Sequence, residues 1–132
     1  MDEKSRTDGS SLDNLCDQIL KIDRSIRFVG IANKMGKTIT ATYRKGTGHL
    51  LTEDESDLST IESVLRMLTR GDLQSKTGKP IYSFTLYEKV KRATIPLDND
   101  EYPVLMVSFD IDGDNEPLIK NKILPLLKEW FN

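Results

Sequence analysis

The sequence predicts an α+β fold in which a five-stranded antiparallel sheet is flanked by helices. Along the 132 residues, hydrophobic residues recur first at helical spacing, then in two alternating segments, and then again at helical spacing. Three alternating segments and a final segment of helical spacing follow. That length is typical of one domain with one core. Val104–Val107 is apolar at every position, which is typical of a central strand covered on both sides. We therefore expect the order α-β-β-α-β-β-β-α within residues 11–132.

The first helix is expected to begin at Ser11, after a disordered polar tail at residues 1–10. A serine at this position can cap the first turn by accepting a backbone N–H. The apolar side chains of this helix recur at steps of three and four residues, at Leu12, Leu15, Ile19, Ile22 and Ile26. Cys16 lies beside this apolar stripe, so we interpret it as a small core residue.

A β-hairpin should follow, with strands at residues 28–32 and 38–43 and with Gly36 at positive φ in the turn. In its second strand, threonines alternate with Ile39, Ala41 and Tyr43, which predicts that these three form the buried face. Gly36-Lys37-Thr38 resembles the end of a phosphate-binding loop. The spacing to Gly30 is one residue too long and no helix follows, so the hairpin turn is the better interpretation.

A second amphipathic helix is expected after the acidic run Glu53–Glu55, since carboxylates favour a helix N-terminus. Gly71 is a plausible stop. The side chains predicted to face the sheet are Leu58, Ile61, Val64, Leu65 and Leu68.

The second half of the chain begins with a polar connector at residues 72–80 and a half-buried strand in which Tyr82, Phe84 and Leu86 alternate with polar residues. The next strand covers residues 91–97, and Pro96 indicates a strand end or an edge there. A third helix should run from about Asn115, kinked at Pro125. Its inward side chains should be Ile119, Ile123, Leu126, Leu127 and Trp130.

Composition excludes several classes of function. There are 19 basic and 21 acidic residues, and this balance provides no field that would attract nucleic acid or anionic lipid. No apolar run could span a bilayer, the N-terminus lacks the layout of a signal peptide, and a single cysteine cannot form an internal disulfide. We expect a cytoplasmic protein that binds neither nucleic acid nor membrane.

The basic stretch Lys89, Lys91 and Arg92, with Tyr82 and Tyr87 nearby, could stack single-stranded nucleic acid. Lysine on a strand also protects a sheet edge from aggregation. We favour that protective role, or a charged surface for a protein partner.

Candidate metal and catalytic residues are few. Asp110, Asp112 and Asp114 alternate as at the start of a calcium loop, but the glycine and the closing glutamate of that loop are missing. An acidic turn that caps the third helix is the better interpretation, and calcium stays a minor hypothesis. His49 and Cys16 show no third residue that would orient them as a catalytic pair. We therefore expect no catalytic residue, no cofactor and no enzymatic activity.

The order of elements, the segment Arg27–Ala32, the Gly36 turn and the strand Thr38–Tyr43 resemble the roadblock (dynein light chain) family and its longin and profilin-like relatives. The chain also resembles short uncharacterised archaeal proteins of this layout. The family resemblance covers about residues 12–131. It implies a non-enzymatic homodimeric adaptor or regulator, with a small GTPase or another signalling protein as its partner.

The resemblance also implies where the dimer would form, on the third strand and the outer face of the second helix. The implied interface residues are Arg66, Met67, Tyr82, Phe84, Leu86 and Tyr87. An alternative hypothesis is a small-molecule sensor of the PAS type. In that case the sheet face and the loop at residues 46–55 would enclose a ligand, with Tyr43 or Phe84 lining it.

Overall fold

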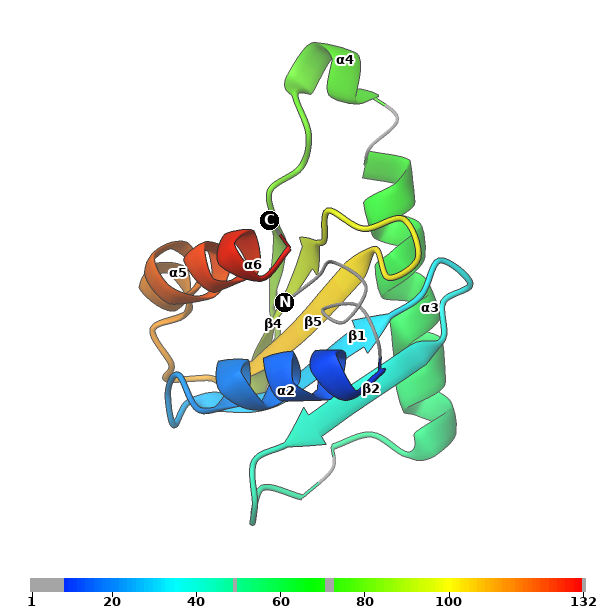
Figure 1. Ribbon diagram of the computed structural model, residues 1–132. Helices are drawn as coiled ribbons and strands as arrows, with labels where there is room; N and C mark the ends of the chain where they lie inside the picture. Colours follow the sequence, from blue (N-terminus) through cyan, green and yellow to red (C-terminus); the bar gives the residue numbers. More distant parts are fainter. Residues whose placement is uncertain (1–8, 49, 71–72, 132) are drawn as a thin grey trace.

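A computed structural model describes residues 9–48, 50–70 and 73–131. Its sheet has the strand order β2-β1-β5-β4-β3, and all neighbouring strands are antiparallel (Figure 1). The strands are β1 (Ile26–Ala32), β2 (Thr38–Tyr43), β3 (Ser83–Leu86), β4 (Val90–Pro96) and β5 (Val104–Asp110). The predicted five-stranded antiparallel sheet is confirmed, and β5 is the central strand, as its apolar sequence indicates.

Helices cover both faces of the sheet (Figure 1). They are α2 (Gly9–Leu20), α3 (Glu53–Arg70), α4 (Gln74–Thr77), α5 (Asn115–Leu118), the π-helical segment η2 (Ile119–Ile123) and α6 (Leu124–Trp130). On one face lie α2 and the C-terminal run α5-η2-α6, and on the other lies α3. We call these the closed face and the α3 face. Within the described part of the chain, no helix has the length and apolarity needed to cross a membrane.

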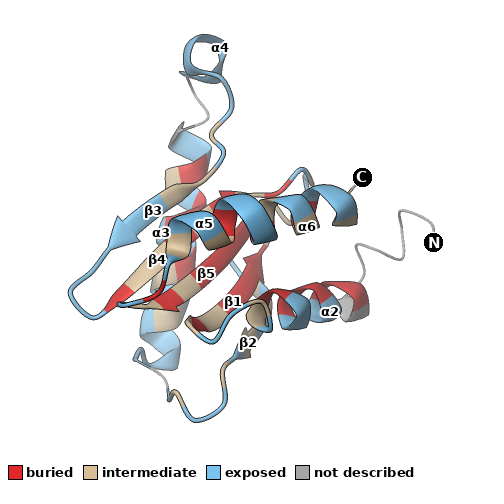
Figure 2. Ribbon diagram, turned by 90° about the vertical axis from the view of Figure 1, so that its left-hand side faces the viewer, coloured by how far each residue is buried: buried red, intermediate tan, exposed pale blue. Residues whose placement is uncertain are grey.

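The closed face holds the main hydrophobic core, in which 16 buried residues from its helices and the sheet form one cluster (Figure 2). Its largest side chain is Phe109 of β5, which has no exposed surface. The buried residues of the cluster are Leu12, Leu15, Cys16, Ile19, Ile26, Val29, Ile31, Ala93, Ile95, Leu97, Leu105, Val107, Phe109, Ile119, Ile123 and Leu127. This large set of packed apolar side chains makes the closed face the main source of stability.

The α3 face has a much smaller core, in which five residues are buried together: Ala32, Val64, Met67, Val104 and Met106. The predicted inward stripe of α3 is mostly wrong, because Leu58, Ile61, Leu65 and Leu68 are 43% to 58% exposed. Thr60, Ser63, Val64 and Met67 face the sheet instead. The hydroxyl groups of Thr60 and Ser63 donate to the backbone carbonyls of Ser56 and Ser59, so this polar-containing side can be buried.

The first helix and the strand after it differ from prediction in two ways. The helix already includes Gly9 and ends at Leu20, and Ile26 opens β1 instead of continuing the helical stripe. A turn separates the two elements, in which the Asp23 carboxylate accepts hydrogen bonds from the backbone N–H and hydroxyl of Ser25 (3.0 and 2.6 Å). Residues 9 and 10 of the predicted tail thus belong to the helix, and residues 1–8 lie outside the described part of the chain.

The predicted burial of β2 is also wrong. Ile39, Ala41 and Tyr43 are exposed, whereas the threonines between them are half-buried. Thr40 donates a hydrogen bond to the Asp13 carboxylate of α2, whereas the Thr38 hydroxyl hydrogen-bonds that of Thr60 on α3 (2.9 Å). The threonines of this edge strand therefore contact helices on both faces of the sheet. The turn of the hairpin is as predicted, since Gly36 has φ of +82°.

The C-terminal helix contains the irregularity that Pro125 predicts, but as a π-helical segment and not a simple kink. Pro125 cannot donate a backbone hydrogen bond, and η2 immediately precedes its turn. Ile119, Ile123 and Leu127 still point inward and are buried. The widened turn therefore keeps the apolar side of the helix on the sheet.

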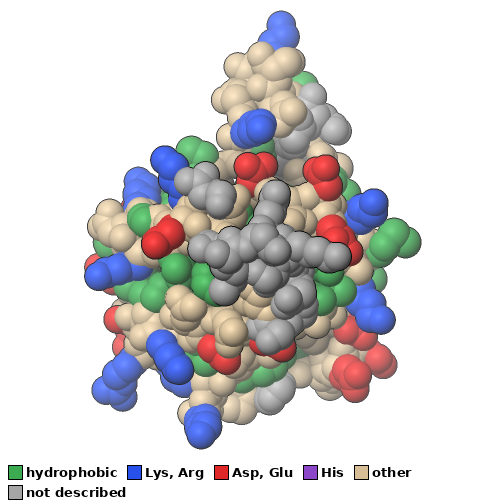
Figure 3. Space-filling view, in the orientation of Figure 1, with side chains coloured by type: hydrophobic (Ala, Val, Ile, Leu, Met, Phe, Trp, Pro, Cys, Tyr) green, Lys and Arg blue, Asp and Glu red, His purple; other side chains and the backbone are tan. Residues whose placement is uncertain are grey.

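The connector between α3 and β3 contains the short helix α4, which projects from the rest of the molecule (Figures 1 and 3). Gly71, the predicted stop of α3, lies outside the described residues. The space-filling view of this side shows basic and acidic side chains interspersed (Figure 3). This distribution agrees with the balanced net charge of −2.

Candidate interaction surface and groove

An apolar stripe runs along the outer side of α3 and faces solvent. It consists of Leu58, Ile61, Leu65 and Leu68, which are 58%, 43%, 55% and 52% exposed. Their spacing of three and four residues places them on one side of the helix. Scattered exposed leucines are common, but four large apolar residues on one helical side form the kind of patch that marks an interaction surface.

The sheet edge next to α3 is also exposed. β3 is an edge strand because only β4 pairs with it. Phe84, Leu86 and Tyr87 are 39%, 64% and 42% exposed. Figure 2 shows β3 mostly in the colour of exposed residues. Ser63 and Arg66 of α3 line one small cavity together with Ser83 and Thr85 of β3. The helix and the edge strand are therefore neighbours on the side that Ser83, Thr85 and Tyr87 share. Phe84 and Leu86 alternate with these residues and lie on the opposite side of the edge strand.

The residues implied by the family resemblance are only partly placed on this surface. Phe84, Leu86 and Tyr87 are exposed at the edge strand, but of the three only Tyr87 lies on the side of α3, and Arg66 is half-buried. Met67 is 6% exposed and packs with Val64 and Met106, so its assignment to the outer side of α3 is wrong. The leucines of α3 that are predicted to face the sheet face solvent instead, and Met67, predicted to face outward, is buried. Tyr82 is half-buried and packs against the core of the closed face.

The N-terminal end of α3 is fixed by a capping box that our sequence reasoning missed. The backbone N–H of Thr52 donates to the Glu55 carboxylate (2.8 Å), and the backbone N–H of Glu55 donates to the Thr52 hydroxyl (3.2 Å). The signal was present as Thr52 followed three residues later by Glu55. The two bonds hold the loop before α3 against the helix, and this loop forms part of a groove.

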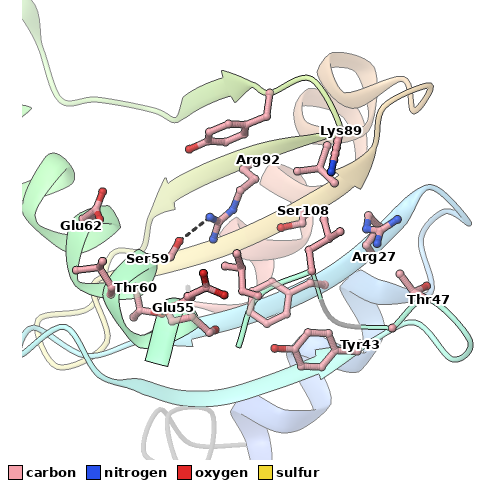
Figure 4. A pocket seen from close by; sticks show the side chains of 18 of the residues that line it. Arg27, Tyr43, Thr47, Glu55, Ser59, Thr60, Glu62, Lys89, Arg92 and Ser108 are labelled. Carbon is pink, nitrogen blue, oxygen red and sulfur yellow. Dashed lines mark hydrogen bonds between the residues drawn. The ribbon is translucent and has the colours of Figure 1, made fainter. Parts of the chain in front are cut away.

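The groove has a volume of about 720 Å³ and lies on the α3 face (Figure 4). Its floor is the end of the sheet that α3 leaves uncovered, at Phe28, Arg92 and Ser108. One wall is the N-terminal half of α3 with the loop before it, and another is the turn between β3 and β4. It combines aromatic and apolar side chains with several cations. Sequence periodicity could not have found it, because its lining comes from several separate segments.

The side chains of the acidic turn after β5 are not gathered as a set of metal ligands. The Asp110 carboxylate accepts hydrogen bonds from Arg44 (2.8 Å) and Arg27 (2.9 Å), which hold its pKa below the usual range, with the bond from Arg44 as the larger cause. No group of three or more His, Cys, Asp or Glu side chains in the described ranges could hold a metal ion. The structure therefore does not bring Asp110, Asp112 and Asp114 together as calcium ligands.

The basic stretch is divided between the two sheet faces. Lys91 donates to the Gly113 carbonyl (2.7 Å), whereas Arg92 points into the groove and donates to Ser59 (Figure 4). Both residues lie on β4, which pairs with β3 and β5. Their predicted role as guards of a sheet edge is therefore wrong.

Of the two candidate catalytic residues, the structure describes only Cys16. Cys16 is fully buried, as predicted, and burial raises the pKa of its thiol to about 12. A thiol with this pKa is almost entirely protonated at neutral pH and is a poor nucleophile. His49 lies outside the described residues.

Comparison with solved structures identifies the class of fold as a roadblock/LC7-like α+β domain. A roadblock/LC7 domain from Streptomyces avermitilis matches with a TM-score of 0.66 at 11% identity, over 89% of this chain and 92% of that one. MglB from Myxococcus xanthus matches with a TM-score of 0.71 at 16% identity, over 95% and 88% of the two chains. The gliding protein MglB from Thermus thermophilus matches with a TM-score of 0.65 at 12% identity, over 90% and 82%.

These matches are likenesses of fold. No family sequence model and no curated protein sequence matches the chain. The matches confirm the roadblock-like fold that the order of elements implies. The archaeal resemblance stays a prediction.

Proposed function

We propose that this chain is a non-enzymatic adaptor or regulatory domain that acts as a homodimer. The observation that carries the proposal is the solvent-facing apolar stripe of α3 beside the unpaired edge of β3. An exposed edge strand is an aggregation liability, and a two-fold dimer that pairs β3 with its copy would remove it. Because α3 lies next to β3, the same two-fold contact would also cover the apolar stripe.

The roadblock-like fold supports this proposal at the level of architecture. One of the similar structures is an MglB with a tetrameric arrangement, which matches with a TM-score of 0.66 at 10% identity. Assembly from several copies therefore occurs in this fold. By the family resemblance, we propose a small GTPase or another signalling protein as the partner of the dimer.

The test is light scattering coupled to size exclusion across a concentration series. We expect a stable mass near twice the chain mass of 15.0 kDa. Leu65→Glu places one carboxylate from each copy in the contact and should raise the dimer dissociation constant at least about a hundredfold. Ile111→Glu is the matched control, because Ile111 is 44% exposed but lies in the turn after β5.

A monomer at all concentrations, or equal dimerisation of both variants, would contradict the proposed dimer. Circular dichroism should show that both variants keep the fold, since neither side chain belongs to a buried cluster. Affinity capture of a purified small GTPase by the wild-type chain but not by Leu65→Glu would connect the partner to the dimer.

A further inference from the structure

The groove has the size and lining of a small-molecule site. Its volume of about 720 Å³ falls within the usual range of ligand pockets, which is roughly 300–1,000 Å³. It exists because α3 packs on Ala32, Val104 and Met106, at one end of the sheet, and leaves the other end of the same face uncovered. The groove is thus built into the way α3 crosses the sheet.

One side of the groove is aromatic. The rings of Phe28 and Tyr43 lie on neighbouring strands with their centroids 4.8 Å apart and tilted by 51°. Phe28 lies over Gly30, where an added Cβ would be only 2.7 Å from the ring. Leu51 and Tyr87 extend this apolar lining from the loop before α3 and from the β3–β4 turn. A flat apolar group would find matching surface here.

The floor of the groove carries a guanidinium group that makes no ion pair with any described residue. Arg92 donates one hydrogen bond to the Ser59 hydroxyl (2.5 Å), as Figure 4 shows. In the described ranges, the ion pairs join Arg27 and Arg44 to Asp110 and Lys120 to Glu116, and none involves Arg92 or Arg66. The pKa of Arg92 is lowered, and burial is the largest cause. A partly buried cation without an anion is costly unless something pairs with it.

A second arginine faces the same space. Arg66 of α3 lines both the groove and the small adjoining cavity, as does Arg92. Two like charges near each other repel, and an anion placed between them would relieve that repulsion. Three carboxylates, of Glu55, Glu62 and Glu88, also line the groove. The one that acts on Arg92 is that of Glu62, which is exposed to solvent.

We propose that this groove binds a small organic anion, with a flat apolar body against Phe28 and Tyr43 and a carboxylate or phosphate group on Arg92. The groove adjoins the apolar stripe of α3, because Leu58 belongs to both. The proposed ligand contacts are Phe28, Tyr43 and Arg92, which lie outside the stripe, so this proposal does not depend on the proposed adaptor function. Binding of this ligand would allow a small molecule to regulate the domain, which a dimer surface alone does not allow. An acidic side chain of a partner protein is the competing occupant of Arg92.

The experiment compares two fluorescent probes that differ in charge. One is 8-anilinonaphthalene-1-sulfonate, an aromatic anion, and the other is N-phenyl-1-naphthylamine, its neutral counterpart. We expect saturable binding of the anionic probe to the wild-type chain. Arg92→Gln should weaken that binding about tenfold or more, because a charge-assisted hydrogen bond is lost, and should leave the neutral probe nearly unaffected.

Two further variants provide controls. Arg24→Gln removes an arginine that is exposed on the turn before β1 and does not line the groove, so binding should not change. Glu62→Gln removes the competing carboxylate and should tighten binding of the anionic probe several-fold. This second variant keeps the proposal testable if Arg92→Gln fails to fold, because Glu62 is exposed and outside both cores.

Competition distinguishes the two headgroups. Phenylacetate and phenyl phosphate share the apolar body and carry a carboxylate or a phosphate, and benzyl alcohol is the neutral control. Displacement of the anionic probe by either anion but not by the alcohol supports the proposal. The stronger of the two anions identifies the preferred headgroup. Absence of saturable binding, or equal binding by wild type and Arg92→Gln, would overturn it. Arg92 would then be assigned to a carboxylate of a protein partner.

Discussion

The two faces of the sheet use the same five strands but are covered in different ways. The closed face has two helical segments over 16 buried residues, whereas the α3 face has one helix over five buried residues and a groove of about 720 Å³. The helix on the α3 face also turns its leucines outward. The closed face therefore supplies stability, and the α3 face supplies the surfaces that another molecule could cover.

Thiol reactivity should separate the two faces most strongly. Cys16 of α2 is buried in the core of the closed face with a pKa raised to about 12, whereas Ser108 lines the open groove. In a Ser108→Cys variant, iodoacetamide should modify position 108 in the folded protein and should modify Cys16 at least about a thousandfold more slowly. Such a difference corresponds to an opening free energy of about 4 kcal/mol. Mass spectrometry of labelled peptides over time measures both rates in one molecule.

Comparable rates at the two positions would show that α2 separates readily from the sheet, and the contrast between the faces would disappear. Urea above the unfolding transition is the control, since both thiols should then react at similar rates.

Two phenylalanines test the contrast by stability. Phe109 is fully buried on the closed face, and Phe28 is half-buried beside the groove. Phe109→Ala should lower the free energy of unfolding by about 3–5 kcal/mol, because it leaves a cavity in a packed core. Phe28→Ala should cost about 1–2 kcal/mol, since the side chain already borders open space. Urea denaturation of both variants gives the two values, and equal losses would contradict the assignment of the main core to the closed face.

The same contrast explains which parts of the fold could be predicted from sequence. β5 is apolar over its first four positions, and this pattern correctly indicates a central strand because both of its faces are covered. Pro96 correctly indicates a strand end, since it is the last residue of β4. Periodicity succeeds in these places because burial within the chain is what determines the residue types.

Periodicity fails on α3 for a physical reason. The buried side of the helix mixes Val64 and Met67 with two hydroxyl-bearing residues, whereas the more hydrophobic side, with Leu58, Leu65 and Leu68, faces solvent. Sequence pattern cannot distinguish a helix side that packs within the chain from one that packs against another molecule, because either can be apolar.

The groove could not be predicted from the sequence for a different reason. Arg92 and Ser59 are 33 positions apart and meet only because β4 and α3 are juxtaposed by the fold.

The smallest expected effect concerns the charged corner beside the groove. Asp110 bridges Arg27 of β1 and Arg44 after β2, and its side chain is 28% exposed. Asp110→Asn should lower the free energy of unfolding by about 1 kcal/mol at neutral pH, a modest value because solvent screens the pairs. Asp100→Asn, in the exposed turn before β5, is the matched control and should change little.

The pH dependence of that difference identifies its cause. The hydrogen bond from Arg44, and then that from Arg27, lowers the pKa of Asp110 in the folded state. A lowered pKa contributes stability that is complete above the unfolded value of about 3.9 and is lost as pH falls through the folded value. The difference between wild type and Asp110→Asn should therefore be constant from neutral pH to about pH 5 and should shrink below about pH 4. If the difference in free energy of unfolding between wild type and Asp110→Asn persisted unchanged in acid, the effect would be assigned to packing. The ion pairs of Asp110 would then contribute nothing to stability beside the groove.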